Sequence, residues 1–281
     1  MSLISVKQLS LFYINKLIQR TYEMKNLTEK PLTGKILVTY FCEPSTRTSA
    51  SFQSAMIRLG GSVISLQGEY SSQQKGESLE DSIQTLSCYG DAIILRHPEK
   101  GSSERASKIS SIPIINAGDG NGEHPTQALL DIFTIYDELL KRNISLYDTN
   151  RRGINITFVG DLTNSRTVHS LIHVLSFFHN INIITEINDE ILKITDVLYV
   201  TRIQKERYKN IDDYNKIISK ENFCLNEENI KLMKEDSIVL HPLPRLQEIS
   251  TSVDNDKRCV YFKQVENGVY ARMAILEEII K

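Results

Sequence analysis

Three hydroxyl groups and one guanidinium stand side by side in the sequence, at Ser45, Thr46, Arg47 and Thr48. They follow the apolar run 36–41, which is typical of a buried strand, and precede a stretch whose apolar residues recur at helical spacing. A helix start exposes unpaired N–H groups that favour an anion, and an arginine fork can bond two phosphate oxygens at once. The sequence therefore predicts a phosphate site here. The alternative is that Ser45 or Thr46 is an ordinary N-cap and that Arg47 is a solvated charge.

Further basic side chains, three arginines and one histidine, stand at the ends of other predicted strands. Because ligands of parallel sheets bind at the carboxyl ends of strands, we expect these side chains to surround a ligand. Together with Arg47 they supply four guanidiniums, which need several negative charges, such as a phosphorylated substrate and a carboxylate. No nucleophile lies next to a positioned base in the sequence, so we expect positioning and charge stabilisation to carry the chemistry. The residues are Arg96 after strand 92–95, His124 at the helix start after strand 112–115, Arg166 after strand 154–159 and Arg202 after strand 197–200.

Apolar and amphipathic segments alternate along the whole chain, which favours parallel sheets covered by helices on both faces. We expect an α/β protein of two doubly wound domains, one of residues 1–125 plus 267–281 and the other of residues 126–266. Helix 126–142 is predicted to connect them. The predicted strands are 36–41, 63–66, 92–95 and 112–115 in the first domain and 154–159, 181–184, 197–200 and 237–240 in the second, and further helices are predicted at 46–59, 79–89, 103–110 and 268–281.

Composition excludes several classes of partner. The chain has 281 residues, 41% hydrophobic and 24% charged, with a net charge of −2. This balance is normal for a globular protein and attracts neither nucleic acid nor an anionic membrane. The four cysteines have no metal-type spacing, and Gly160 stands alone where a dinucleotide-binding turn needs three glycines. No apolar run is long enough to span a bilayer, so we expect a soluble, cytoplasmic protein without metal or cofactor.

Eight motifs, in order and over nearly the whole chain, resemble those of the aspartate carbamoyltransferase family. The resemblance implies transfer of the carbamoyl group from carbamoyl phosphate to the amino group of L-aspartate. The products would be N-carbamoyl-L-aspartate and phosphate, in de novo pyrimidine biosynthesis. The motifs are Ser45-Thr46-Arg47-Thr48, Lys75-Gly76-Glu77, Arg96-His97-Pro98, His124-Pro125-Thr126-Gln127, Gly160-Asp161-Leu162, Arg166-Thr167-Val168-His169-Ser170, Arg202-Ile203-Gln204-Lys205-Glu206-Arg207 and His241-Pro242-Leu243-Pro244-Arg245.

The resemblance also implies a role for each matched residue. Thr48, Arg96 and His124 would hydrogen-bond the carbonyl oxygen as it gains charge, and Arg47, Lys75 and Gln127 would complete the catalytic set. The first domain would bind carbamoyl phosphate and the second aspartate. Carbamoyl phosphate would be bound by Ser45, Thr46, Arg47, Thr48, Ser71, Lys75, Arg96, His124, Gln127 and the backbone carbonyls of Pro242 and Leu243, and aspartate by Lys75, Arg166, Arg202, Gln204 and Leu243.

Assembly follows from the same resemblance. Ser71 and Lys75 would reach into the active site of an adjacent subunit, which makes a homotrimer the minimal catalytic form. A regulatory chain is a further partner that family members can have. His241 is expected to orient the Pro242-Leu243-Pro244 turn rather than to titrate in catalysis.

Two alternatives remain beside this interpretation. Ornithine carbamoyltransferases share the Ser-Thr-Arg-Thr signature, but their cationic acceptor would be repelled by Arg202, and they have His-Cys-Leu-Pro where this chain has His241-Pro242-Leu243-Pro244. A non-catalytic scaffold would have lost residues such as Arg47, Lys75, Arg96 or His124, and none is lost.

The chain also departs from the family pattern in three places. Thr163-Asn164-Ser165 replaces the usual Lys-Tyr-Gly, and Gln247 stands where Asp is common. The segment between Phe178 and Thr195 is short by one strand–helix unit, which usually takes roughly 30 residues. We therefore expect a second domain that lacks one such unit.

Overall fold

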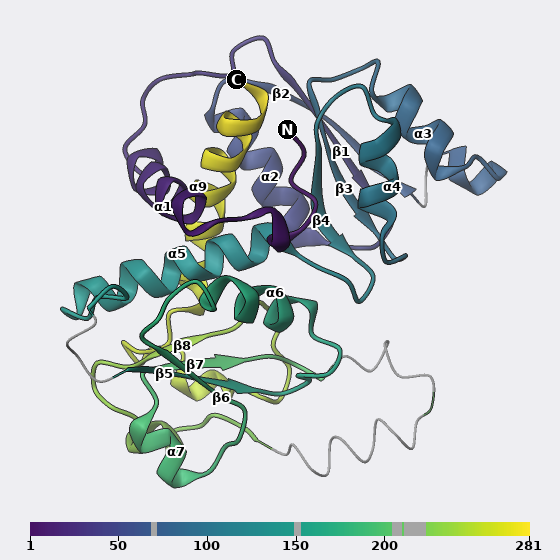
Figure 1. Cartoon of the computed structure of the whole chain (residues 1–281). Coiled ribbons are helices and arrows are strands. Elements are labelled where there is room, and N and C mark those ends of the chain that lie inside the picture. The colour runs from purple at the N-terminus through teal and green to yellow at the C-terminus, as the bar shows by residue number, and fades with distance from the viewer. Residues whose placement is uncertain (69–71, 149–152, 204–209, 211–222) are drawn as a thin grey trace. The chain divides into compact units, whose positions relative to one another are not determined.

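The computed structural model describes residues 1–68, 72–148, 153–203, 210 and 223–281. The chain divides into two compact units, unit 1 with residues 1–130 and 266–281 and unit 2 with residues 131–265. Each unit holds a four-stranded parallel sheet with helices on both faces (Figure 1). The predicted α/β class with two doubly wound sheets is thus confirmed. The domain boundaries expected from the sequence, after residues 125 and 266, stay a prediction.

Unit 1 is built on a sheet with the strand order β2-β1-β3-β4. The chain passes from β1 to β2 on one side and then crosses to β3 on the other side of β1. Its elements are η1 (Val6–Gln8), α1 (Leu11–Met24), β1 (Ile36–Phe41), α2 (Thr46–Arg58), β2 (Ser62–Gln67), η3 (Ser72–Lys75), α3 (Leu79–Leu86), β3 (Ala92–His97), α4 (Ser102–Ile109), β4 (Ile114–Asp119), the start of α5 (Pro125–Lys141) and most of α9 (Tyr261–Ile280).

Alternation of side chains along the strands explains why both faces of this sheet are covered. Val38 and Tyr40 of β1 pack with Ile93 and Leu95 of β3 and with apolar residues of α3 and α4. Successive residues of a strand point to opposite faces, so the residues between them face the other layer. That layer holds α1, α2 and α9 (Figure 1). The Arg272 guanidinium of α9 lies 5.0 Å from the centre of the Phe52 ring of α2.

Two strands extend further than their apolar runs predicted. β3 continues through Arg96 and His97, and β4 runs from Ile114 to Asp119 instead of ending at residue 115. The reason is pairing, because Arg96 pairs with Phe41 of β1 and His97 pairs with Asp119, and the N-terminal segment adds a parallel bridge at the outer edge of β4. The Leu3 N–H donates to the Ile114 carbonyl at 2.9 Å, and the Asn116 N–H donates back to Leu3 at 2.9 Å. Polar residues expected in loops therefore lie in the sheet.

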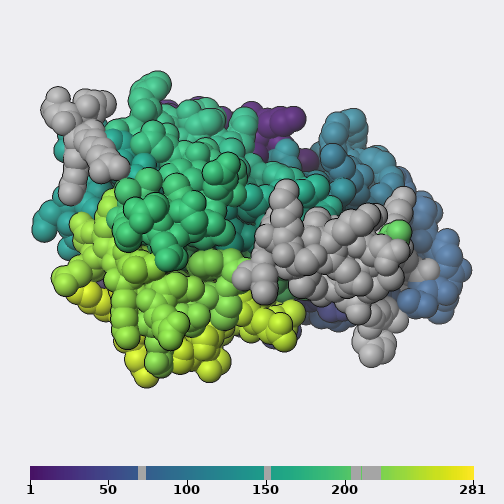
Figure 2. Space-filling model, turned by 90° about the horizontal axis from the view of Figure 1, so that it is seen from below, coloured from purple at the N-terminus to yellow at the C-terminus, as the bar shows by residue number. Residues whose placement is uncertain are grey.

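Unit 2 repeats the plan with the strand order β6-β5-β7-β8. In the space-filling view the green surface of residues 153–203 lies beside the yellow-green surface that follows residue 223, as the pairing of β7 with β8 requires (Figure 2). The shortening of this domain by one strand–helix unit stays a prediction. The elements are β5 (Ile154–Val159), α6 (Arg166–Leu175), β6 (Ile181–Ile184), α7 (Asp189–Ile194), β7 (Val197–Val200), η5 (Asn229–Leu232), β8 (Ile238–Leu240) and η6 (Thr251–Val253).

A buried polar link ties α5 to the second sheet. The Tyr199 hydroxyl of β7 donates to Asp131 of α5 at 2.8 Å, and the Gln264 amide donates to the other oxygen of Asp131 at 2.6 Å. Burial raises the pKa of Tyr199 well above its ordinary value, so the phenol stays a donor. Among the described residues, no helix has both the length and the hydropathy that a bilayer crossing requires.

Candidate functional site

Each sheet has one switch point, where the strand order reverses. Ligands of open α/β sheets bind at such a point, beyond the carboxyl ends of the strands. In unit 1 this point lies between β1 and β3, and in unit 2 between β5 and β7. The predicted residues Arg47 and Arg96 belong to the first point, and Arg166 and Arg202 belong to the second. Strand topology therefore brings the predicted residues together in two groups, one in each unit.

The β1–α2 turn offers a helix N-terminus with polar side chains around it. Ser45 occupies the N-cap position, but its side chain makes no capping hydrogen bond to the helix backbone. Thr46 and Arg47 are exposed in the first turn, whereas Thr48 is buried. The ordinary N-cap that formed the alternative interpretation is thus absent at Ser45. The turn has the donors that bind an anion, namely first-turn N–H groups, hydroxyls and a guanidinium.

Arg96 is fixed between two neighbouring strands. It pairs in register with Phe41 at the end of β1, and the Cys42 N–H donates to the Arg96 carbonyl at 2.8 Å. Its side chain reaches Glu43 across 3.2 Å between Nε and Oε2 and donates from Nη1 to the Ala117 carbonyl of β4 at 3.4 Å. The guanidinium therefore lies beside the β1–α2 turn with its orientation set from both sides.

Glu43 orients the predicted site residue Arg96, and sequence reasoning missed it although it stands two positions before Ser45. Its carboxylate and the Arg96 side chain are each 15% exposed. Cys42, its neighbour, offers no nucleophile, because burial raises the pKa of the thiol to about 11. A neutral thiol at this position agrees with chemistry that depends on binding and charge stabilisation.

His124 stands directly before α5 and is buried. Its carbonyl accepts from the N–H groups of Gln127 at 3.0 Å and Ala128 at 3.2 Å, so it begins the helix. Its Nδ1 lies 3.4 Å from the Thr126 hydroxyl. Gln127, buried in the first turn, lies close to His124 in the sequence and on the same helix end.

The loop before His124 is held by two carboxylates that the sequence did not single out. Asp119 accepts from the N–H groups of Glu123 and Gly101, each at 2.8 Å. Glu123 accepts from the Ser5 hydroxyl at 2.8 Å and from the Val6 N–H at 2.7 Å. The N-terminal segment therefore anchors the loop that carries His124. The sequence signal that could have revealed this anchor was an acidic residue, Glu123, directly before the predicted site residue His124.

Lys75 is the last residue of η3 and is exposed. Its predicted partner in the substrate site, Ser71, lies outside the described residues. An exposed lysine is available to a neighbouring molecule, and its expected contact with an adjacent subunit stays a prediction.

At the switch point of unit 2, the backbone of Thr201 packs closely against Gly160. Its φ is +106°, and a Cβ added there would lie 1.8 Å from the Thr201 carbonyl oxygen. The Thr201 N–H donates to the Val159 carbonyl at 2.8 Å, and its hydroxyl lies 3.4 Å from that of Ser165. These contacts bring together the turns that follow β5 and β7.

Both predicted arginines of unit 2 belong to those turns. Arg166 is the buried first residue of α6, and Arg202 is half-buried two positions after β7. Gln204 lies outside the described residues. Two guanidiniums at one switch point suit a ligand with two carboxylates.

The turn after β8 places backbone atoms at the same end of the sheet. Pro242 and Leu243 follow His241, and Leu243 has a φ of +55°, in the left-handed region. The Leu243 N–H donates to His241 Nδ1 at 2.7 Å, and His241 Nε2 donates to Glu248 at 2.8 Å. Sequence reasoning predicted the orienting role of His241 but missed Glu248.

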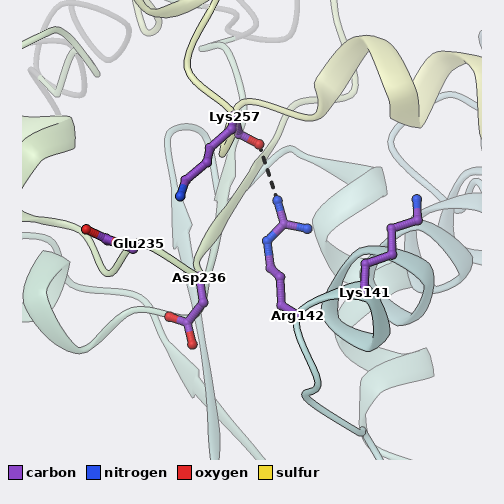
Figure 3. Close-up of a pocket in the computed structure, with 5 residues that line it drawn as sticks. All are labelled: Lys141, Arg142, Glu235, Asp236 and Lys257. Atoms are coloured by element: carbon purple, nitrogen blue, oxygen red, sulfur yellow. Dashed lines mark hydrogen bonds between the residues drawn. The ribbon is translucent and has the colours of Figure 1, made fainter.

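A cavity of about 400 Å³ in unit 2 lies elsewhere (Figure 3). Glu235 and Asp236 precede β8, whereas the predicted site residues follow their strands, so this cavity belongs to the opposite, amino end of the sheet. Arg142 in its wall donates to the Lys257 carbonyl at 3.2 Å (Figure 3). The cavity contains none of the predicted site residues, and its lining is Lys141, Arg142, Glu235, Asp236 and Lys257.

Two domain models of one protein family match most of the chain. Residues 1–137 match the family described as aspartate/ornithine carbamoyltransferase, carbamoyl-P binding domain, and residues 178–279 match its Asp/Orn binding domain. The chain is 43% identical to the aspartate carbamoyltransferase catalytic subunit of Picrophilus torridus, over 99% of this chain and 98% of that subunit.

A multifunctional protein is also among the relatives. The multifunctional protein pyr1-3 of Dictyostelium discoideum is 45% identical over 97% of this chain, which spans only 13% of that protein. Among solved structures, the fold resembles aspartate transcarbamoylase from Trypanosoma cruzi in complex with carbamoyl phosphate and aspartate. The TM-score is 0.93, with 38% identity over 100% of this chain and 97% of that chain.

Proposed function

This chain belongs to the aspartate/ornithine carbamoyltransferase family, and we propose that it transfers the carbamoyl group of carbamoyl phosphate to L-aspartate. The products are N-carbamoyl-L-aspartate and phosphate, in pyrimidine biosynthesis. The observation that carries the proposal is the pair of switch points. One has the donors for a phosphate and a developing oxyanion, and the other has two guanidiniums for a dicarboxylate.

Carbamoyl phosphate binds in unit 1 through its phosphate and its carbonyl group. The first turn of α2 holds the phosphate with the hydroxyls of Ser45, Thr46 and Thr48 and with the guanidinium of Arg47. Lys75 and Ser71 of an adjacent subunit add donors. Burial of Thr48 and the fixed start of α2 support this assignment, because preformed donors lose little entropy on binding.

The reaction is nucleophilic attack by the amino group of aspartate on the carbonyl carbon. As the tetrahedral centre forms, the carbonyl oxygen gains negative charge, which Thr48, Arg96 and His124 stabilise by hydrogen bonding. Gln127 and the carbonyls of Pro242 and Leu243 accept from the carbamoyl NH2. The bond to the phosphate oxygen then breaks. The phosphate leaves with the electron pair, and it accepts the amine proton, since the second pKa of a phosphate group lies near 6.

Aspartate is the acceptor that fits unit 2. Its two carboxylates pair with Arg166 and Arg202, with Gln204 as a further donor. An ornithine side chain would bring a positive charge to the same guanidiniums, and like charges at close range repel. The names of the similar proteins support aspartate as well.

An assay of product formation with each acceptor tests the proposal. We expect carbamoyl aspartate from carbamoyl phosphate and aspartate, and no product with ornithine. Turnover with ornithine, or with neither acceptor, would contradict the proposed reaction.

Two variants test the division of roles. His124→Ala is expected to lower kcat by about 100-fold, because it removes a donor to the oxyanion, and to leave phosphate inhibition unchanged. Arg202→Ala is expected mainly to raise KM for aspartate. Identical kinetic defects in the two variants would show that the roles are wrongly assigned.

The catalytic form is a homotrimer in the cytoplasm, with active sites shared between subunits and with a regulatory chain as a further partner. The exposed position of Lys75 in η3 supports sharing, because its side chain is accessible to a neighbouring copy. Sedimentation of the purified chain tests the trimer, and co-purification from the source cells tests the regulatory chain.

A further inference from the structure

The turn that follows β8 is held by a short relay of hydrogen bonds. The Leu243 N–H donates to His241 Nδ1 at 2.7 Å, and His241 Nε2 lies 2.8 Å from Oε1 of Glu248. The His241 side chain is 1% exposed, so water does not replace either partner. A backbone N–H can only donate, which makes Nδ1 an acceptor without a proton. The imidazole is therefore neutral, with its proton on Nε2.

Glu248 is the group that selects this tautomer. Burial raises the pKa of Glu248, but hydrogen bonds from His241 and from the backbone outweigh that effect and leave the pKa below its ordinary value. Glu248 is therefore a carboxylate at neutral pH, and a carboxylate can only accept. It keeps the proton on Nε2 and leaves the Nδ1 lone pair for Leu243.

The hydrogen bond matters because Leu243 has an unusual backbone conformation. Its φ of +55° lies in the left-handed region, which a residue with a branched side chain rarely adopts without support. The Leu243 N–H bond to His241 supplies that support directly. Losing it would free the backbone whose carbonyls, at Pro242 and Leu243, accept from the carbamoyl NH2 in the proposed reaction.

The Leu246 N–H also donates to Glu248, at 3.1 Å, but other anchors of the turn do not involve the relay. The His241 N–H donates to the Gln264 side chain at 2.9 Å. Arg245 pairs with Asp254 and donates to the Tyr261 hydroxyl. Removal of the Glu248 carboxylate is thus expected to release the conformation at Leu243 and not the fold of unit 2.

We propose that Glu248 is a positioning residue for carbamoyl phosphate, acting through the Nε2–H tautomer of His241 to fix the Pro242 and Leu243 carbonyls. The inference rests on the proposed function, because it assumes that these carbonyls bind the carbamoyl NH2. Glu248 does not touch the substrate. Its effect appears in the affinity for the carbamoyl group and not in the affinity for phosphate, which α2 binds in unit 1.

The test compares two variants of one residue. Glu248→Met removes the acceptor at similar length, and Glu248→Gln keeps an oxygen acceptor. We expect Glu248→Met to raise KM for carbamoyl phosphate about tenfold, the loss of roughly one hydrogen bond, while the inhibition constant of inorganic phosphate stays within about twofold. Glu248→Gln restores KM to near the unsubstituted value. Glu227→Met, at an exposed carboxylate of the same unit, is the matched control.

A substitution at His241 separates positioning from simple packing. An asparagine side chain accepts from the N–H two residues on, as in Asx turns, and needs no partner at Glu248. In the His241→Asn background, Glu248→Met is therefore expected to have no further effect on KM. Equal effects of Glu248→Met in both backgrounds would overturn the proposal.

The remaining outcomes are equally decisive. An unchanged KM in Glu248→Met, or a parallel loss of phosphate affinity, would also overturn the proposal, since a general structural defect moves both constants. If Glu248→Met does not fold, Glu248→Asp replaces it, because the shorter side chain withdraws the carboxylate from His241. Absence of product from the unsubstituted protein would instead refute the proposed function, so the two failures are distinguishable.

Discussion

At the scale of single residues, the two arginine groups depend on partners that lie far away in the sequence. Arg96 is oriented by Glu43 and by the Ala117 carbonyl, and the turn before Arg166 is packed against Thr201. The arginines could be predicted because a guanidinium at a strand end is a local pattern. Glu43 could not be assigned, since its partner Arg96 is brought near by strand order, which local periodicity does not specify. Glu248 is only seven residues from His241, but both lie in an irregular turn, to which periodicity does not apply.

At this scale, Gly160 gives a specific prediction for the stability of the protein. An alanine there would combine a φ of +106° with a Cβ 1.8 Å from the Thr201 carbonyl oxygen. We expect Gly160→Ala to lower the free energy of unfolding by at least about 3 kcal/mol, because backbone atoms must move. Denaturant unfolding followed by circular dichroism measures this change.

Gly34 provides the matched control. It also has a positive φ, of +82°, but an added Cβ would meet nothing within 4 Å. Gly34→Ala should therefore cost only the backbone term, about 1–2 kcal/mol. Equal losses in the two variants would show that the close approach at Gly160 is unimportant.

At the scale of elements, hydrophobic periodicity was enough to locate the eight strands of the described residues and to end several of them, such as β1 and β5, but not β3 and β4. β3 and β4 extend into polar residues because the N-terminal segment pairs with β4 and because His97 pairs with Asp119. The last helix begins at Tyr261, before the predicted residue 268. Gly268 was interpreted as a helix start, but it lies inside α9, where an added Cβ would meet the end of the Arg272 side chain at 2.8 Å and a Leu130 methyl group at 3.2 Å.

The link between α5 and β7 gives a prediction for the stability of unit 2. Tyr199→Phe removes the hydroxyl that donates to buried Asp131. We expect a loss of about 1–3 kcal/mol in the free energy of unfolding, since a buried acceptor loses a donor. Tyr89→Phe, at a tyrosine that is 54% exposed, is the control and should change stability by less than about 0.5 kcal/mol. A Tyr199 variant as stable as the control would contradict the role of this link.

The pairing of α1 with α9 predicts how stability depends on pH. Arg20 donates to both carboxylate oxygens of Glu277, at 2.6 and 2.8 Å, which lowers the pKa of Glu277 below its ordinary value of 4.5 although burial acts in the opposite direction. The stabilisation is complete above pH 4.5 and is lost as the pH falls through the lowered pKa. Glu277→Gln should remove about 1–2 kcal/mol at pH 7 and flatten the acid dependence.

The neighbouring pair on the same helices is the control for this measurement. Lys16 and Glu278 lie 2.7 Å apart, but the lysine side chain is 54% exposed. Glu278→Gln should therefore change stability at pH 7 by less than about 1 kcal/mol. Unfolding curves recorded from pH 3 to pH 7 compare the two variants. A Glu277 variant that keeps the full acid dependence would contradict this account.

At the scale of the whole molecule, the proposed sharing of active sites between subunits predicts complementation between inactive chains. If the proposal holds, Lys75→Ala and His124→Ala damage different parts of one site, which in the proposed trimer come from different subunits. Mixed trimers formed at equal ratio should regain activity in about a quarter of their sites, where both contributing subunits carry the intact residue. Each variant alone is the control. No recovery after dissociation and reassembly of the mixture would refute sharing between subunits.

Unit 1 is made of two pieces of chain, with unit 2 inserted between residues 130 and 266. A ribosome synthesises residues 131–265 before the main part of α9, whose Ala271, Ile275 and Leu276 are fully buried. On the nascent chain, unit 2 is therefore complete while the older unit 1 still lacks a helix of its core. We expect the half of the protein that is made first to finish folding last, when the final turns of α9 leave the exit tunnel.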